Sequence, residues 1–168
     1  MNIVGIDPSY TATGIAHADG TVETIKWRGE NRCRLCDAYE KVVGTVIGSE
    51  LWDTKPDLIV IEGYAHGAKN AAHQMGELGG VLRLAFMHAG IPYLDISPPT
   101  LKKFATGKGN AVKERVLAEA IRRLGYEGHS TDEADALWLR EIGLALSGAN
   151  QSDIPKVNLT ALDGLELP

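Results

Sequence analysis

Four carboxylates in this chain have the types and positions of a divalent-metal site. Asp7 follows a short apolar run near the start of the sequence, and Glu62 closes a second apolar run. Asp132 and Asp135 stand three residues apart in a segment with helical periodicity, so both project from one helix face. Strand ends and a helix start can meet at one edge of a sheet, where clustered acids repel one another unless cations bind between them. The sequence therefore predicts a site for a hard cation.

The two strand-end carboxylates also have an ordinary explanation. Asp7 with Pro8 and Ser9 is typical of a surface turn, and a charged residue that ends a strand, as Glu62 does, usually faces solvent. Pro8 excludes helix at Asp7 and so holds this side chain at the strand end. The two together favour a site, because open α/β sheets bind ligands where strand ends border one crevice.

The helical pair has its own alternative. The helix dipole favours an acid such as Asp132 in a first turn, and Ser130 with Glu133 fits a capping box. That account explains Asp135 less well, because this residue lies past the first exposed amides and within an apolar stretch. Asp135 therefore favours a functional role for the pair.

The charge of the chain is unevenly distributed. The formal net charge is -5, which by itself argues against a polyanion as partner. Residues 97–123, however, have a net charge of +5, and the remainder has -10. A solvated helix face is the alternative explanation, but beside a carboxylate cluster a footprint for backbone phosphates is favoured. The seven cations are Lys102, Lys103, Lys108, Lys113, Arg115, Arg122 and Arg123.

The hydrophobic pattern predicts the scaffold that positions these groups. Residues 3–6 form an apolar strand, and two alternating runs flank the turn Asp19-Gly20, which is typical of a hairpin. The apolar run 58–61 indicates a buried strand reached through a helical crossover. We expect an α/β fold with a mixed five-stranded sheet, three antiparallel strands plus two parallel, and helices on both faces. The remaining pattern predicts a strand at 93–96 and helices at 32–52, 68–89, after Pro98-Pro99, 111–124 and 131–146.

Length and composition predict a single domain. At 168 residues and 44% hydrophobic, the chain suits one well-buried domain and is too short for two ordinary ones. We expect the domain to span residues 1–147, and residues 148–168 to form an extended C-terminal tail. This tail lacks periodicity, so it should be ordered only where it packs on the domain or a partner.

Neither a membrane nor a structural zinc ion is expected. No run of about 18 apolar residues is present, and the start lacks the basic residues of a signal peptide, which predicts a soluble, cytoplasmic protein. Cys33 and Cys36 form a lone C-x-x-C with no second cysteine pair. Two reduced cysteines on a helix are the favoured interpretation.

The order and spacing of the motifs resemble a known family. The opening Val4-Gly5-Ile6-Asp7-Pro8, a central Ile-Val-Ile-Glu, a lysine-rich loop and D-x-x-D-A-L are similar to RuvC-type Holliday junction resolvases of the RNase H-like superfamily. The resemblance covers roughly residues 1–147. It implies that two Mg²⁺ ions, for which Mn²⁺ substitutes, are held by Asp7, Glu62, Asp132 and Asp135. Glu133 is an alternative ligand.

The resemblance also implies where the DNA lies. Lys102 and Lys113 match lysines that the family places near the scissile phosphate. Lys103 and Lys108 are expected to contact DNA, with plain solvation as the alternative.

A second DNA-contacting segment is implied after the catalytic Glu. Lys69 and Asn70 match the start of the helix that reaches the junction in the family. The chain departs from the pattern here, with one extra residue after Glu62 and no clear match to the family's aromatic wedge. Tyr64 and His66 are the candidates for that wedge.

The implied function is that of a homodimeric, Mg²⁺-dependent DNA endonuclease that resolves four-way junctions by paired symmetric nicks during recombination and repair. Two nicks need two active sites, which implies a dimer. The predicted helix 68–89 carries Met75, Leu78, Leu82 and Ala85 on one face, which could pack against its twin or against its own sheet. The acidic balance is compatible with a stand-alone, virus-encoded enzyme.

Two other functional classes fit parts of the sequence. The first is another RNase H-like nuclease, acting on other branched DNA or on RNA hybrids. The second is a non-catalytic nucleic-acid-binding module or an actin-like ATPase fragment, since Gly5-Ile6-Asp7 followed by Thr13-Gly14 is similar to a phosphate-binding hairpin. The ATPase needs a second lobe, and a pure binder has little use for four acids beside a basic loop.

Overall fold

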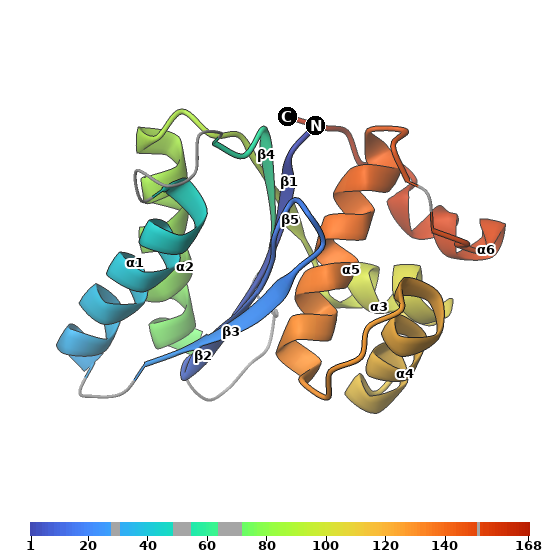
Figure 1. Ribbon diagram of the computed structural model, residues 1–168, viewed down its shortest axis with the longest axis horizontal. Helices are drawn as coiled ribbons and strands as arrows, with labels where there is room; N and C mark the ends of the chain where they lie inside the picture. Colours follow the sequence, from blue (N-terminus) through green and yellow to red (C-terminus); the bar gives the residue numbers. More distant parts are fainter. Residues whose placement is uncertain (28–30, 49–54, 64–71, 151) are drawn as a thin grey trace.

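A five-stranded sheet lies between two helical layers in the computed structural model, which describes residues 1–27, 31–48, 55–63, 72–150 and 152–168. Helices α1 and α2 cover one face of the sheet, and α5 with α3 and α4 covers the other (Figure 1). The strands are β1 Ile3–Pro8, β2 Ala12–Ala16, β3 Val22–Lys26, β4 Leu58–Glu62 and β5 Tyr93–Ile96. The long helices are α1 Asn31–Ile47, α2 Ala72–His88, α3 Pro98–Thr106, α4 Lys113–Leu124 and α5 Thr131–Leu146.

The strand order is β3-β2-β1-β4-β5. Strand β1 pairs antiparallel with β2 and parallel with β4, while β2–β3 is antiparallel and β4–β5 is parallel. The expected mixed sheet, with three antiparallel strands, two further parallel ones and helices on both faces, is confirmed. None of the helices in the described parts of the chain is long and apolar enough to cross a membrane.

Alternation along β1 and β4 builds two separate cores. Ile3 and Val60 face α5 and join a core with Trp138 and Leu139. Their neighbours face the opposite way, into a core that includes Leu82 and the rest of the α1–α2 layer. Both central strands are therefore apolar on both faces, as the continuous run at 58–61 predicted.

Two glycines let α5 lie directly against the sheet. A Cβ at Gly5 would collide with the carbonyl oxygen of Ala136, and a Cβ at Gly14 would collide with that of Asp132. Because both strands lack a side chain where α5 crosses them, the helix backbone approaches more closely than any larger residue allows. This contact fixes the first turn of α5 over the ends of β1 and β2.

Several element boundaries differ from expectation. Strand β1 continues through Pro8, so Asp7 lies inside the strand and pairs with Gly14. Helix α1 ends at Ile47, before Gly48, whose φ of 131° lies in the left-handed range. Helix α4 begins at Lys113, two residues later than expected. Shifts of one or two residues are usual at the ends of helices and strands, where local interactions rather than the hydrophobic pattern determine the last residue.

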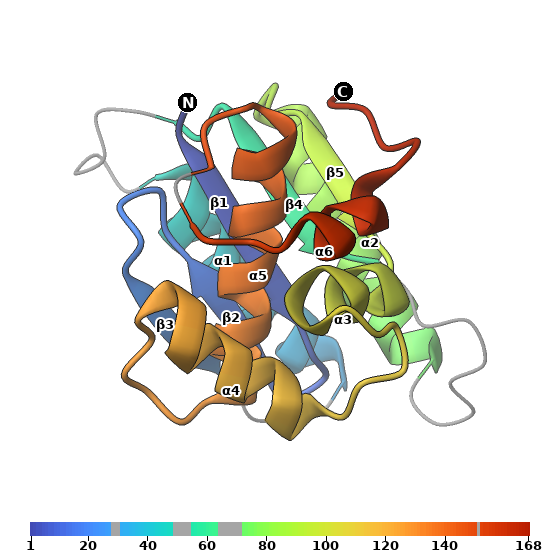
Figure 2. The ribbon, with the colours of Figure 1, turned by 90° about the vertical axis from the view of Figure 1, so that its right-hand side faces the viewer.

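The C-terminal segment is not simply extended, which corrects the sequence expectation. It contains a short helix, α6 Lys156–Leu159, followed by a 3₁₀ turn, Thr160–Leu162. Asn158 is buried at 3% exposure, and Leu162 and Leu165 pack against the α5-side core. Figure 2 shows the segment running across α5 to α3. A four-residue helix is too short to leave a periodic signature, which explains the missed prediction.

Candidate active site

Asp7 and Glu62 lie side by side at the carboxyl ends of β1 and β4. Ile6 is in register with Ile61, and the alternation that turns Val60 toward α5 turns both acids the same way. Asp7 is 3% exposed, and the nearby charge of Glu62 adds to burial in raising the pKa of Asp7, so the two carboxyl groups lie close together.

Helix α5 supplies the other two carboxylates from its first turns. Ser130 is the N-cap, and its Oγ accepts a hydrogen bond of 3.3 Å from the Glu133 amide. Asp132 and Asp135 follow one face of the helix; the Asp132 side chain is 28% exposed and that of Asp135 is 8% exposed. The cap, together with the close approach at Gly14, brings this helix start to the same edge as Asp7.

Lys113, the first residue of α4, completes the cluster. Its Nζ lies 4.0 Å from Asp132 Oδ1 and 3.8 Å from Asp135 Oδ2. The charge of Lys102 on α3 lowers the pKa values of Glu62 and Asp135, so this lysine also lies near the acids. The structure thus brings together all six residues for which the sequence predicted catalytic roles.

The protonation of the cluster follows from burial and crowding. Burial, with the nearby charges of Glu62 and Asp135, raises the pKa of Asp7 well above its usual value. Burial also raises the pKa of Glu62, and it raises that of Asp135 to about 7 against the opposing charge of Lys113. Burial lowers the pKa of Lys113, but the surrounding carboxylates outweigh this effect and raise it overall. The site therefore favours added positive charge.

The donor set suits a hard divalent cation. Asp7, Glu62, Asp132 and Asp135 present only carboxylate oxygens, the ligands that Mg²⁺ and Mn²⁺ prefer. Among the described residues, no three His, Cys, Asp or Glu side chains already form a metal-binding cluster. The Lys113 ammonium instead lies against two of the four carboxylates.

The chain as a whole is similar to a known protein family. The family model described as crossover junction endodeoxyribonuclease RuvC matches residues 3–140. The chain belongs to the RuvC family. The RuvC of Gloeobacter violaceus is 31% identical over 88% of this chain and 87% of its own length, and that of Chlorobium phaeovibrioides is 27% identical over 91% and 86%.

Solved RuvC structures share the fold. The Thermus thermophilus RuvC structure has a TM-score of 0.66 at 22% identity and covers 92% of this chain and 100% of that one. A second structure, of T. thermophilus RuvC in complex with Holliday junction substrate, has the same TM-score at 20% identity. At these identities the likeness shows the fold alone. The predicted RNase H-like nuclease fold of the RuvC family is confirmed.

Glu133, the alternative ligand within the RuvC motif, is engaged elsewhere. Its Oε1 accepts a 2.7 Å hydrogen bond from Thr24 Oγ1, and its Oε2 accepts one of 2.6 Å from the Tyr126 hydroxyl. Burial and the bond to Glu133 together raise the pKa of Tyr126 to about 12. Glu133 therefore ties the start of α5 to β3 and to the loop after α4, a role that its sequence neighbours do not signal.

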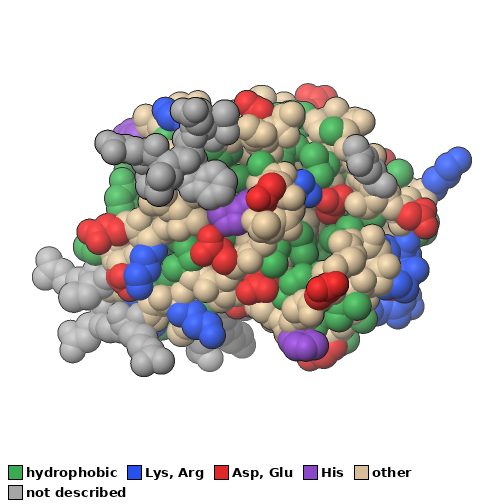
Figure 3. All heavy atoms as spheres, in the orientation of Figure 1, with side chains coloured by type: hydrophobic (Ala, Val, Ile, Leu, Met, Phe, Trp, Pro, Cys, Tyr) green, Lys and Arg blue, Asp and Glu red, His purple; other side chains and the backbone are tan. Residues whose placement is uncertain are grey.

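The predicted DNA contacts of this RuvC family member divide into three groups. Lys108 is exposed in the loop between α3 and α4, as a phosphate contact requires. The Lys103 ammonium instead donates a 3.1 Å hydrogen bond to the Thr160 carbonyl. Tyr64, His66, Lys69 and Asn70 lie outside the described residues. Figure 3 shows lysine and arginine side chains gathered at the edge of the molecule where α3, α4 and α6 lie.

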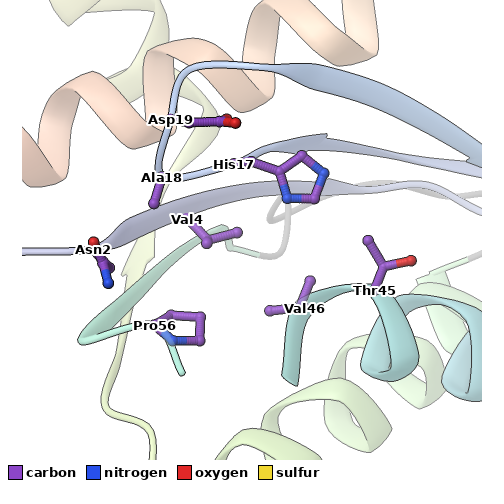
Figure 4. A pocket seen from close by; sticks show the side chains of 8 residues that line it. All are labelled: Asn2, Val4, His17, Ala18, Asp19, Thr45, Val46 and Pro56. Carbon is purple, nitrogen blue, oxygen red and sulfur yellow. The ribbon is translucent and has the colours of Figure 1, made fainter. Parts of the chain in front are cut away.

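The cavity drawn in Figure 4 is separate from the carboxylate cluster. It measures about 300 Å³ and is bordered by Asn2, Val4 and His17 at the amino end of β1. His17 Nε2 lies 2.8 Å from Glu23 Oε1. Asp7 stands at the other end of the same strand, so this cavity is not part of the carboxylate site.

Proposed function

We propose that the chain acts as a homodimeric, Mg²⁺-dependent endonuclease that resolves four-way DNA junctions by paired symmetric nicks. The observation that carries the proposal is the meeting of Asp7, Glu62, Asp132 and Asp135 with Lys113 at one sheet edge. The RuvC family supplies the reaction class, crossover junction cleavage.

Asp7, Glu62, Asp132 and Asp135 would hold the cations. A pair of divalent cations, when bound, supplies an activated water and charge stabilisation for the leaving 3′-oxygen of an in-line displacement. Because burial and the neighbouring carboxylates raise the pKa of Asp7, cation binding at this residue would compete with protons. The chain's own contribution is to keep the four acids close and largely buried.

Lys113 and Lys102 would act on the substrate phosphate. With its pKa raised by the surrounding acids, Lys113 stays protonated at neutral pH and cannot serve as a base. Its charge can instead offset the extra negative charge that the pentacoordinate phosphorus carries in the transition state. Lys102, on the adjacent helix, approaches the same acids from α3.

The basic stretch would hold the backbone of the DNA arms. Lys108 is exposed in the loop between α3 and α4, and residues 97–123 have a net charge of +5 while the rest of the chain has -10. Phosphate contacts of this kind give affinity without sequence readout, which suits recognition of a branched shape. The T. thermophilus relative solved with a Holliday junction supports the same class of substrate.

Dimerisation would rest on the outer face of α2. Leu78, Leu82 and Ala85, which the sequence offered as a possible twin-packing face, are buried, and Leu78 and Leu82 belong to the chain's own α1–α2 core. Leu84 and Met87, on the opposite face of α2, are 51% and 63% exposed and are free for a second copy. Paired nicks on a two-fold symmetric junction require such a two-fold partner.

A gel assay of an immobile synthetic four-way junction, with and without Mg²⁺, tests the proposal. We expect two symmetric nicks with 5′-phosphate and 3′-hydroxyl ends only when Mg²⁺ is present. A replication fork and an RNA–DNA hybrid, run in parallel, separate junction resolution from the other RNase H-like activities. Preferential cleavage of the hybrid, or none of the junction, would contradict the proposal.

A further inference from the structure

The helices that carry the two lysines have few buried anchors. Helix α4 buries only Val116 and Ala120, and α3 buries Leu101, Phe104 and Ala105. Helix α5, which carries the aspartates, buries nine residues. Buried apolar area sets how firmly an element is held, so α3 and α4 need other contacts to keep their lysines in place.

The C-terminal strap, residues 152–167, supplies contacts to the end of α3. Asn158 Nδ2 donates a 2.7 Å hydrogen bond to the Phe104 carbonyl, and Lys103 Nζ donates one of 3.1 Å to the Thr160 carbonyl. Phe104 has one of the last four carbonyls of α3, which no amide within the helix can satisfy. Asn158 is 3% exposed, so this cap is made in a buried environment where a hydrogen bond counts most.

The turn at Gly107, directly after α3, packs closely against the Asn158 side chain. Gly107 adopts a φ of 79°, and a Cβ there would lie 3.2 Å from Asn158 Oδ1. The Gly107 amide bonds to the Lys103 carbonyl at 2.8 Å, and Thr106 Oγ1 bonds to that of Lys102 at 2.7 Å. Asn158 thus completes the set of caps that ends α3 just before the loop leading to Lys113.

The strap also reaches α4 and α5. Arg123 Nη1 donates a 2.8 Å hydrogen bond to the Asp153 carbonyl, and Ser152 Oγ donates one of 2.7 Å to Glu141 Oε2. One segment therefore links three helices that together carry both lysines and two of the aspartates. The match to the family model ends at residue 140, before the strap begins.

We propose that the C-terminal strap positions Lys102 and Lys113 for phosphodiester cleavage, with Asn158 as the positioning residue that caps α3. This inference rests on the proposed nuclease function. Asn158 touches neither the acids nor the substrate and acts through α3 and the 107–112 loop. A displacement of either lysine by even a fraction of an ångström weakens transition-state stabilisation while the carboxylates on β1, β4 and α5 stay in place.

The first experiment is a mutant cycle on single-turnover junction cleavage in the full-length protein. Asn158→Ala should slow cleavage by roughly 10-fold, less than the ~100-fold that a 1 Å misplacement can cost. In a Lys102→Ala background the same change should slow cleavage clearly less, because part of the effect of Asn158 consists in positioning the Lys102 side chain, which is then absent. Val157→Ala, at a 64% exposed position on the same helix, is the matched control and should cleave at the wild-type rate.

Thermal unfolding of each variant separates positioning from loss of fold. All rates are compared at a temperature where every variant is folded. Asn158→Asp keeps the shape but cannot donate to the Phe104 carbonyl, so it should be as slow as Asn158→Ala. Wild-type cleavage rates in both Asn158 variants, or full additivity with Lys102→Ala, would overturn the positioning role.

Amide hydrogen exchange tests the strap independently of cleavage. In Asn158→Ala, amides from Lys103 to Val112 should exchange faster, while those of β1 and α5 keep their protection. Unchanged exchange from Lys103 to Val112 would overturn the inference whether or not the protein cleaves junctions. Faster exchange in a protein that cleaves no junction would support the strap's hold on α3 while contradicting the proposed function.

Discussion

The two helical layers cover the same sheet in different ways. On the α1–α2 face, Leu82 and Phe86 belong to the same apolar core as Ile59. On the α5 face, two glycines admit the helix backbone, and the carboxyl groups of Asp7 and Asp135 are buried beside it. Burying carboxylates lowers the free energy of unfolding. The apolar packing on the α1–α2 face can offset this cost on the α5 face. The first layer mainly stabilises the fold, and the second positions the chemistry.

The sharpest test of this contrast exchanges one acid in each layer. Asp7→Asn should remove detectable junction cleavage while leaving junction binding intact, because a cation ligand is lost and the basic stretch is unchanged. Asp37→Asn, on the surface of α1 where Asp37 pairs with Lys41, should cleave normally. Gel-shift and cleavage assays on the same preparations measure both properties. Full activity in Asp7→Asn would refute its assignment.

Within the active layer, a lysine and an aspartate should fail in different ways. Lys113→Ala removes a transition-state charge and should raise the barrier by about 2.7–4 kcal/mol with little change in metal dependence. Asp135→Asn removes a proposed metal ligand, and Mn²⁺, which binds such sites more tightly than Mg²⁺, should relieve its defect in part. Single-turnover cleavage against metal concentration distinguishes them. Metal rescue of Lys113→Ala alone would reverse the two roles.

A glycine substitution in each layer compares their tolerance. Gly14→Ala places a Cβ against the Asp132 carbonyl, so it should destabilise the fold by about 1–3 kcal/mol and slow cleavage by shifting the aspartates. Gly44→Ala on α1 meets no atom within 4 Å and should stabilise the helix by up to about 1 kcal/mol without changing cleavage. Urea unfolding and the cleavage rate report the two effects. Equal responses would contradict the contrast between the layers.

The smallest expected effect separates two neighbouring lysines. Lys108→Ala should lower the slope of log affinity against log salt by about 0.9, since the exposed side chain would lose one phosphate contact. Lys103→Ala should change the slope less, because its ammonium is bonded to the Thr160 carbonyl. Junction-binding titrations at several salt concentrations measure this difference. A larger change for Lys103 would assign the phosphate contact to that residue instead.

Much of the fold was predictable from local pattern. The apolar runs ending at Asp7 and Glu62, and the hairpin signal at Asp19-Gly20, predicted a mixed sheet of three antiparallel and two further parallel strands. Strand periodicity also fixes which face each side chain takes, so two acids at neighbouring parallel strand ends had to meet. In the same way, the helical period places Asp132 and Asp135, three residues apart, on one face of a helix.

Other features depended on contacts between residues far apart in sequence. Glu133 fits a capping box from its neighbours, yet its carboxylate bonds to Thr24, 109 residues away. In the sequence Lys103 is one more cation of the basic stretch, but in the fold its ammonium donates a hydrogen bond to the Thr160 carbonyl, 57 residues later. A lone polar residue gives no local signal of its distant partner, so sequence pattern could not assign either role.

The sequence by itself determined the sheet, the four carboxylates and the family, because strand and helix periods and motif spacing are local properties. Tertiary structure decided which face of α2 is buried and where the C-terminal segment folds. Those choices depend on which surfaces remain uncovered once the sheet has formed. It also set the protonation of the site, since the pKa of Asp135 reaches about 7 only through burial and the neighbouring charges that the assembled fold brings together.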